Sequence, residues 1–260
     1  MMNEEILSLF KECADLVHRE IKSLEKGQFH EDMGMGADGT PTKWIDKKAE
    51  ETAIKFLQDN CRYSILSEEE GVLPGKEDGT IIIDPIDGTR NAILDLPFYC
   101  ISLAFAEEDL STVRVGYVRN LATGKEYSTV KGEGAFSGER ELNPVIRDDW
   151  IFSVYMGENA HPDSTKIASI PRRTRSLGSA ALEICMVADG IFDLHLHWTL
   201  DQKRSLRITD LAAAVLILRE VGGEVYDRDW QPINMNLDPT ERKDVTAIYD
   251  KDILEVDRKS

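Results

Sequence analysis

The sequence predicts a mixed α and β protein in which an α+β half precedes an α/β half. After residue 60, short apolar runs follow one another without helices between them, which is typical of a largely antiparallel sheet. After about Pro144, strand and helix patterns alternate instead. We therefore predict two closely packed subdomains, residues 1–145 and 146–260, with a cleft between them as the default site.

Two amphipathic helices are expected to cover the sheet of the first subdomain. Apolar residues recur at helical spacing from Ile6 to Leu24, and Thr42 can cap a second helix that runs to about Asp59. Between them, Gly34 to Pro41 is rich in glycine and polar residues, which predicts a mobile loop. The expected strands are Tyr63–Leu66, Thr80–Ile83, Tyr99–Ala106, Thr112–Val118 and Lys125–Val130.

The second subdomain should contain three strands and two helices. Small residues open the first of these helices, and there they would let an anion approach the free amide groups, so this start is a candidate phosphate cradle. The expected strands are Ile151–Tyr155, Ile191–Leu196 and Val245–Tyr249, and the expected helices are Ser179–Ala188 and Thr209–Val221.

Charge and hydropathy exclude several classes of partner. The chain has 31 Lys and Arg against 48 Asp and Glu, and this net charge of −17 argues against nucleic acids and anionic membrane surfaces. The longest apolar run, Leu211 to Leu218, is too short to cross a bilayer. The four cysteines are scattered, without metal-ligand or redox spacing, which suits a reducing compartment. We expect a cytoplasmic protein.

The most informative motif is IIIDPIDGT at residues 81–89. Asp84 leaves at the end of an apolar strand, while Asp87 lies in the turn made by Pro85 and Gly88, so both carboxylates can converge on one small volume. Two unpaired acids so close would repel each other unless a cation lies between them. Because every side-chain donor here is oxygen, a hard divalent ion such as Mg²⁺ is the expected occupant.

Further acids follow other elements. Glu68 and Glu69 come after the strand YSIL, which would place more carboxylates on the same edge of the sheet. Asp210 opens an apolar helix, where it can serve as an N-cap, as a metal ligand, or as both. His195 and His197 form an HxH pair without a third soft ligand nearby, so we expect two strand-edge histidines rather than a transition-metal site.

Together these motifs resemble the inositol monophosphatase family. The resemblance rests on DPIDGT at Asp84–Thr89 with Asn91, on the pair Glu68 and Glu69, and on TDLAAA followed by EVGG at Glu220–Gly223. The family belongs to the lithium-sensitive, Mg²⁺-dependent sugar phosphatases, which include fructose-1,6-bisphosphatases. It implies a layered αβαβα fold over nearly the whole chain.

The sequence departs from the family pattern at two positions. Ala92 stands where the family usually has an aromatic residue, and Thr209 stands where it often has Trp. Both departures concern the substrate pocket more than the metal site.

The resemblance also implies the metal ligands. Two or three Mg²⁺ ions per site are expected, with Mn²⁺ as a possible substitute, and a third ion would bind loosely near Glu68 and Asp46. The first ion would be held by Glu68, Asp84 and the carbonyl of Ile86, and the second by Asp84, Asp87 and Asp210.

The family's reaction implies further roles. Thr89 and Asp46 would orient and deprotonate the metal-activated water that attacks the phosphorus in line. Glu69 is the alternative base, and the loop that contains Asp38 would act as a lid.

The substrate pocket is basic where the family is often acidic. Seven residues before Asp210 the family often has a carboxylate that holds inositol hydroxyls, but this chain has Lys203. Basic residues suit a second phosphate, since arginine donates paired hydrogen bonds to it, although a solvated basic loop is the other interpretation. The candidate substrate-binding residues are Asp87, Gly88, Thr89, Ser179, Ala180, Tyr155, Arg172, Arg173, Arg175, Lys203, Arg204 and Arg207.

This pattern is similar to the archaeal type that hydrolyses both fructose 1,6-bisphosphate and inositol 1-phosphate. One alternative is a 3′-phosphatase acting on adenosine 3′,5′-bisphosphate, and another is a non-catalytic regulator that binds Mg²⁺ or a sugar phosphate. The resemblance favours a homodimer. The sequence leaves open the preferred substrate and the lithium sensitivity.

Overall fold

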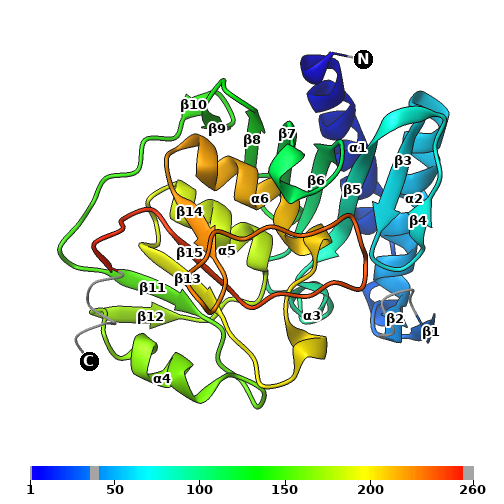
Figure 1. Cartoon of the computed structure of the whole chain (residues 1–260). Coiled ribbons are helices and arrows are strands. Elements are labelled where there is room, and N and C mark those ends of the chain that lie inside the picture. The colour runs from blue at the N-terminus through cyan, green and yellow to red at the C-terminus, as the bar shows by residue number, and fades with distance from the viewer. Residues whose placement is uncertain (1, 36–40, 254–260) are drawn as a thin grey trace.

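Five layers of alternating helices and sheets make up the chain, in a computed structural model that describes residues 2–35 and 41–253. Figure 1 shows two N-terminal helices outside a large sheet, two further helices in the middle, a second sheet, and a short helix on the far side. This arrangement confirms the layered αβαβα fold that the family resemblance implies.

The first layer consists of α1 (Asn3–Ser23) and α2 (Trp44–Asn60). Both bury one apolar face against the large sheet, as their helical periodicity predicts. The expected cap of α2 is wrong: the N-cap is Lys43, and the Thr42 hydroxyl donates to Glu69 instead. The ends of the expected loop pair as β1 (Asp32–Met35) and β2 (Pro41–Lys43), after the 3₁₀ turn η1 (Lys26–Gln28). Asp38 lies outside the described residues.

The second layer is the large sheet, in which only β3 and β5 are parallel neighbours. The largely antiparallel sheet expected from the sequence is therefore confirmed. Along its order the strands are β10 (Arg140–Glu141), β9 (Ala135–Ser137), β8 (Glu126–Val130), β7 (Val115–Asn120), β6 (Cys100–Ala106), β5 (Glu77–Asp87), β3 (Tyr63–Ser67) and β4 (Gly71–Leu73).

The expected start of β7 at Thr112 is wrong. Residues Leu110–Thr112 form a 3₁₀ turn, η2, because the Asp109 carboxylate accepts hydrogen bonds from the amides of Ser111 and Thr112. This side-chain cap competes with strand pairing, so the strand begins three residues later.

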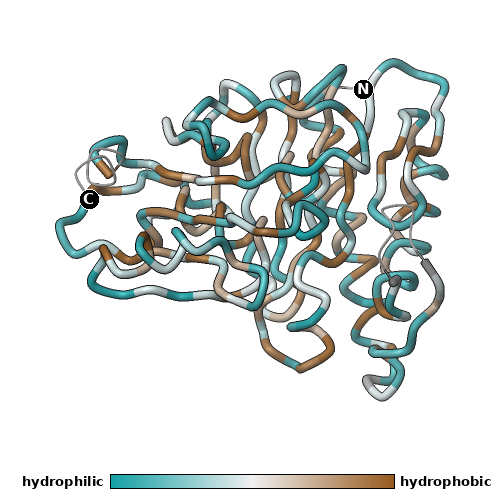
Figure 2. The backbone as a smooth tube through the Cα atoms, turned by 60° about the horizontal axis from the view of Figure 1, so that its bottom comes forward, coloured by the Kyte–Doolittle hydropathy of each residue, from teal (hydrophilic) through white to brown (hydrophobic). Residues whose placement is uncertain are grey.

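The third layer, α5 (Ala180–Ala188) and α6 (Ile208–Glu220), lies between the two sheets. Nearly every residue of both helices is buried, because each is apolar around its whole circumference. One hydrophobic cluster joins these helices to β6, β7 and β8 on one side and to Val225, Val245 and Ala247 on the other. Figure 2 shows hydrophobic segments running through these inner layers, while most peripheral loops are hydrophilic.

The fourth and fifth layers complete the molecule. The histidines are not at a strand edge as expected, because β13 is the central strand of the second sheet and His195 is buried. Residues 191–193 precede this strand rather than belonging to it. The order is β12 (Arg173–Arg175), β11 (Ile151–Val154), β13 (Leu194–His197), β15 (Val245–Ile248) and β14 (Glu224–Tyr226), with α4 (Pro162–Ala168) packed outside.

The predicted boundary at residues 145 and 146 falls between β10 and β11, where the chain leaves one sheet for the other. The division into two subdomains stays a prediction. No helix among the described residues is both long and apolar enough to span a membrane.

We expect Gly116→Ala to destabilise the fold by about 1–3 kcal/mol, because overpacking is costly where two layers touch. A Cβ at this position of β7 would lie 2.9 Å from the Ala213 carbonyl oxygen of α6. Urea unfolding followed by circular dichroism measures the change. Gly27→Ala is the control, since a Cβ added at Gly27 would have no neighbour within 4 Å among the described residues. Equal stabilities of the two variants would contradict the prediction.

Candidate active site

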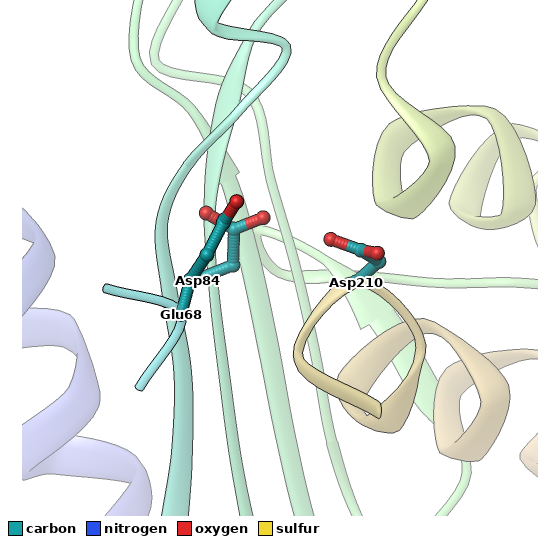
Figure 3. A group of neighbouring side chains, drawn as sticks. All are labelled: Glu68, Asp84 and Asp210. Carbon is teal, nitrogen blue, oxygen red and sulfur yellow. The ribbon is translucent and has the colours of Figure 1, made fainter. Parts of the chain in front are cut away.

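Three carboxylates from different elements converge at one end of the large sheet. Glu68 follows β3, Asp84 lies near the end of β5, and Asp210 lies in the first turn of α6. One oxygen from each lies within 4.8 Å of the others. Figure 3 shows Glu68 and Asp84 from the sheet side pointing toward Asp210 on the helix side. The structure thus brings together three residues that the family resemblance joined, while their role as metal ligands stays a prediction.

The DPIDGT motif shapes this end of β5. The register with β6 shifts between Asp84 and Asp87, so the strand bends where Pro85 stands. The amide of Ile86 donates to an Asp84 oxygen at 2.9 Å, which fixes that carboxylate. Gly88 then turns the chain into α3 (Thr89–Ile93) with φ of 92°, and a Cβ there would lie 3.1 Å from the Gly178 carbonyl oxygen. Only glycine suits both demands.

Asp87 lies beside the cluster, and its carboxylate is hydrogen-bonded to the start of α5 in the middle layer. Its Oδ2 accepts hydrogen bonds from the Ser179 hydroxyl and the Ala181 amide, both at 2.8 Å. These donors belong to the start of α5, where free amides favour negative charge. Ser179 and Ala180 were expected to receive a substrate anion, and the structure shows Ser179 engaged with Asp87.

Arg207, an expected substrate ligand, also contacts the acidic cluster. Its guanidinium pairs with Glu68 and, at 3.3 Å, with Asp210. The Arg207 amide donates to Asp210 at 2.7 Å, so Asp210 is also part of an N-terminal capping box. The expected N-cap is therefore wrong, because the N-cap of α6 is Arg207 and Asp210 supports the helix start from its third residue. The place of Asp210 in the acidic cluster is compatible with the metal-ligand interpretation.

Burial and mutual repulsion dominate the electrostatics of the metal-free cluster. Burial raises the pKa of Glu68 to about 8, although Arg207 opposes this shift. Burial raises the pKa of Asp87 to about 7, with added repulsion from Asp210, and it also raises the pKa of Asp84 well above its usual value. Asp210 differs: burial raises its pKa, but the charge and hydrogen bonds of Arg207 outweigh burial and hold it below the ordinary value.

The expected water-activating residues lie on the α2 side of the cluster. The Thr89 hydroxyl donates to Asp46 at 2.8 Å and lies 3.2 Å from the Ile86 carbonyl oxygen. Burial raises the pKa of Asp46 to about 7. Thr89, Asp46 and Glu69 line a cavity of about 230 Å³ that Glu68 also borders. The structure thus brings these residues together as the sequence predicted, while their roles stay predictions.

A larger cavity of about 550 Å³ opens on the other side of the cluster. Of the expected substrate residues, Gly88 lies behind this cavity, against Gly178. Arg172, Arg173 and Arg175 do not line it, because all three are exposed, the last two on the edge strand β12 and Arg172 just before it. The expected residues that do line it are Asp87, Tyr155, Ser179, Ala180, Lys203, Arg204 and Arg207.

Sequence analysis missed several residues of the cavity wall, among them Arg242 and His197. The His197 ring stacks on Tyr155, with 4.4 Å between ring centroids. Arg242 reaches the cavity because Lys243 forms a bridge with Leu206, a pairing between distant segments that no local pattern indicates. The alternation of β13 places His195 and His197 on one face, and this signal could have pointed to His197.

The donor set fits a divalent cation bound by oxygen. Three carboxylates meet in a largely buried volume, and the Ile86 carbonyl and Asp87 lie next to it. Without a cation, burial leaves most of these acids with raised pKa values, which is the expected penalty of crowding like charges. Neither cysteine nor histidine belongs to the acidic group found among the described residues. Such a set suits hard cations.

Comparisons with known proteins agree with this architecture. The model of the inositol monophosphatase family matches residues 2–251. A fructose-1,6-bisphosphatase/inositol-1-monophosphatase of Methanothermobacter thermautotrophicus is 42 % identical over 207 residues, which cover 74 % of this chain and 72 % of the relative. A bifunctional NADP phosphatase/NAD kinase of Methanococcus maripaludis is 34 % identical over 245 residues, 85 % of this chain and 42 % of that longer protein.

A solved structure shows the same fold. The crystal structure of an inositol monophosphatase-fructose 1,6 bisphosphatase superposes with a TM-score of 0.86 at 25 % identity, covering 100 % of this chain and 99 % of the other. Layered fold and acidic cluster together define a metal-dependent phosphatase. The chain belongs to the inositol monophosphatase family.

We expect the metal-free protein to lose stability as the pH rises from 6 to 8. The pKa values of Asp46, Glu68 and Asp87 are raised to about 7, 8 and 7, so the folded state holds protons that the unfolded state has released. Thermal unfolding in EDTA measures this, and added Mg²⁺ should raise the melting temperature more at pH 8. Glu68→Gln should flatten the metal-free dependence. A melting temperature that rises with pH in EDTA would show that the sign is wrong.

Proposed function

We propose that the protein is a Mg²⁺-dependent phosphomonoester hydrolase that acts on fructose 1,6-bisphosphate, inositol 1-phosphate or both. The observation that carries this proposal is the convergence of Glu68, Asp84 and Asp210 beside a cavity with a basic wall. Relatives named for both activities support the substrate class. The oxygen donors support Mg²⁺ as the ion, with Mn²⁺ as a substitute and two to three ions per site.

Mg²⁺ bound by Glu68, Asp84, Asp87, Asp210 and the Ile86 carbonyl would neutralise the phosphate and lower the pKa of the attacking water. The residues of the chain supply the proton path. The Thr89 hydroxyl can accept the proton of a water while it donates its own to Asp46, with which it is already hydrogen-bonded. A pKa of about 7 suits Asp46 to act as a base near neutral pH. Glu69, which accepts from Thr42, is the alternative base.

The basic part of the cavity lining supports a substrate with a second phosphate. Lys203, Arg204 and Arg242 line the same cavity as Asp87 and Ser179. Arginine binds phosphate through paired hydrogen bonds. A sugar bisphosphate could therefore place one phosphate at the carboxylates and the other at these bases, whereas inositol 1-phosphate would use only the first.

A second candidate substrate is a nucleotide phosphate, such as the 2′-phosphate of NADP or the 3′-phosphate of adenosine 3′,5′-bisphosphate. The observation in its favour is the stacked pair of Tyr155 and His197 in the cavity wall, since aromatic faces bind bases by stacking. The relative named as an NADP phosphatase also supports it. A non-catalytic regulator is not favoured, because the Thr89–Asp46 pair is in place. A homodimer and a cytoplasmic location stay predictions.

Phosphate release should require Mg²⁺ and should be fastest with fructose 1,6-bisphosphate or inositol 1-phosphate. A colorimetric phosphate assay with a panel that adds NADP and adenosine 3′,5′-bisphosphate, each with Mg²⁺ or with EDTA, measures this. Turnover confined to the two nucleotides would replace the first substrate class by the second. Turnover that EDTA leaves unchanged would contradict the metal-dependent mechanism.

We expect Thr89→Val to lower kcat by about 100-fold or more, because it removes the hydroxyl that links water to Asp46. Thr89→Ser keeps a hydroxyl and should retain much more activity. Steady-state kinetics at saturating Mg²⁺ compare the two variants, and circular dichroism verifies their folding. If Thr89→Val turns over as fast as Thr89→Ser, the hydroxyl has no part in the proton path.

A further inference from the structure

Two buried glutamates lie next to the site without belonging to the acidic cluster. Glu50 in α2 is 2 % exposed, and Glu183 in α5 is 4 % exposed. Within the described part of the chain, each carboxylate is balanced by hydrogen-bond donors rather than by a basic side chain. Burying a carboxylate is costly unless its oxygens are well hydrogen-bonded, so two such residues call for a specific explanation.

Glu50 holds the turn that carries Glu68. Its Oε1 accepts hydrogen bonds from the Ser67 hydroxyl, from the Glu69 amide at 3.1 Å and from the Glu70 amide at 3.2 Å. These three donors lie on both sides of Glu68 in sequence. A single oxygen atom of α2 therefore fixes the backbone on either side of a residue in the acidic cluster.

Glu183 holds the segment before α5 with both of its oxygens. Oε1 accepts from the Ser153 hydroxyl and from the Leu177 amide at 3.0 Å. Oε2 accepts from the amides of Gly178 at 3.1 Å and Ser179 at 3.3 Å. Four donors thus surround this carboxylate.

The segment that Glu183 holds leads directly to Asp87. The Ser179 hydroxyl donates to the Asp87 carboxylate at 2.8 Å. On its other side, the Leu177 carbonyl accepts from the Asn91 side chain at 2.7 Å, and Asn91 follows the DPIDGT motif. Glu183 and Asn91 therefore fix residues 177–179 from two sides. In this position the Ser179 hydroxyl can donate to Asp87.

We propose that Glu50 and Glu183 are positioning residues of this phosphatase site: Glu50 sets Glu68 through the 67–70 turn, and Glu183 sets Asp87 through Ser179. This inference rests on the proposed function for its catalytic meaning, but the metal affinity tests it without turnover. Glu183 borders the larger cavity, but its two oxygens are engaged by the Ser153 hydroxyl and by the backbone amides of residues 177–179. Each glutamate thus acts by fixing a backbone segment, and buried networks of this kind hold one geometry rigidly.

The two carboxylates differ in a way that distinguishes positioning from mere packing. The Ser67 hydroxyl and the amides of Glu69 and Glu70 all donate to one oxygen of Glu50, so the carbonyl oxygen of a glutamine can accept all three hydrogen bonds. Each of the two oxygens of Glu183 accepts two hydrogen bonds from N–H or O–H groups. A glutamine at this position must therefore turn its NH₂ group, which is itself a donor, toward two other donors. Glu50→Gln should therefore preserve the site, whereas Glu183→Gln should disturb it. Residue volume is nearly unchanged in both variants.

Titration calorimetry with Mg²⁺ on the full chain tests the Glu50 half. Glu50→Ala should weaken Mg²⁺ binding by about 10-fold or more, as is usual when a ligand loses its supporting partner, and Glu50→Gln should stay within about threefold of the wild type. Ser67→Ala removes one of the three donors and should give an intermediate loss even if Glu50→Ala fails to fold. Glu51→Ala is the matched control, because Glu51 pairs with Lys48 at the helix surface.

Titration calorimetry with Mg²⁺ and kinetics at saturating Mg²⁺ together test the Glu183 half. Glu183→Gln should weaken Mg²⁺ binding and lower kcat, each by about 10-fold or more. Ser153→Ala, which removes one donor to Glu183, should lower kcat less. Glu50→Gln serves as the comparison, since it makes the same chemical change on the other side of the site.

Equal losses of Mg²⁺ affinity in Glu50→Gln and Glu50→Ala would overturn the positioning role of Glu50. Wild-type Mg²⁺ affinity in Glu183→Gln would overturn that of Glu183. A wild-type protein that binds Mg²⁺ but releases no phosphate from any ester would contradict the proposed function alone, because calorimetry on the Glu50 and Glu183 variants would still decide both positioning roles.

Discussion

The repulsion among buried carboxylates is the constraint on which the site depends. Glu68, Asp84 and Asp210 bring their oxygens within 4.8 Å of one another, and Asp87 adds its charge from the side. Packing of the layers leaves these groups little room to separate, because β5 and α6 are both fixed by large hydrophobic clusters. The stability of the core is therefore what holds like charges together, and Arg207 offsets only part of their repulsion.

Different layers of the fold contribute different residues to the site. The ends of β3 and β5 supply acids from the large sheet, α2 supplies Asp46, and the middle helices supply Asp210 and the donors that hold Asp87. The second sheet supplies the aromatic part of the cavity through Tyr155 and His197. The acids, Asp46 and the aromatic rings thus reach the site from different layers. This arrangement suits a reaction that needs charge neutralisation on one side and a proton path on another.

The sequence predicted those parts of the molecule that short segments determine. DPIDGT specifies its own bend through Pro85 and Gly88, so Asp84 and Asp87 could be assigned to one site from local chemistry. Asp210 looked like an N-cap, but it is the third residue of α6 and accepts a hydrogen bond from the amide of the actual N-cap, Arg207. Only the family resemblance joined it to the other acids. Arg242 could not be found from the sequence, because it reaches the cavity through the pairing of Leu206 with Lys243.

The arginines at 172, 173 and 175 were expected near the site. They are exposed instead, on β12 at the edge of the second sheet and directly before it. Thr42 and Thr112 were misassigned because tertiary partners or a neighbouring aspartate outweighed their propensities.

The position of α6 late in the chain and in the middle of the structure has a consequence for biogenesis. The helix is apolar on every side and finds its cover only between two sheets, one of which is completed by β15 near the C-terminus. During synthesis, β3 and β5 leave the ribosome long before Asp210 does. The nascent chain therefore carries an incomplete set of acids for much of translation, and the cluster is completed only when the whole assembly closes.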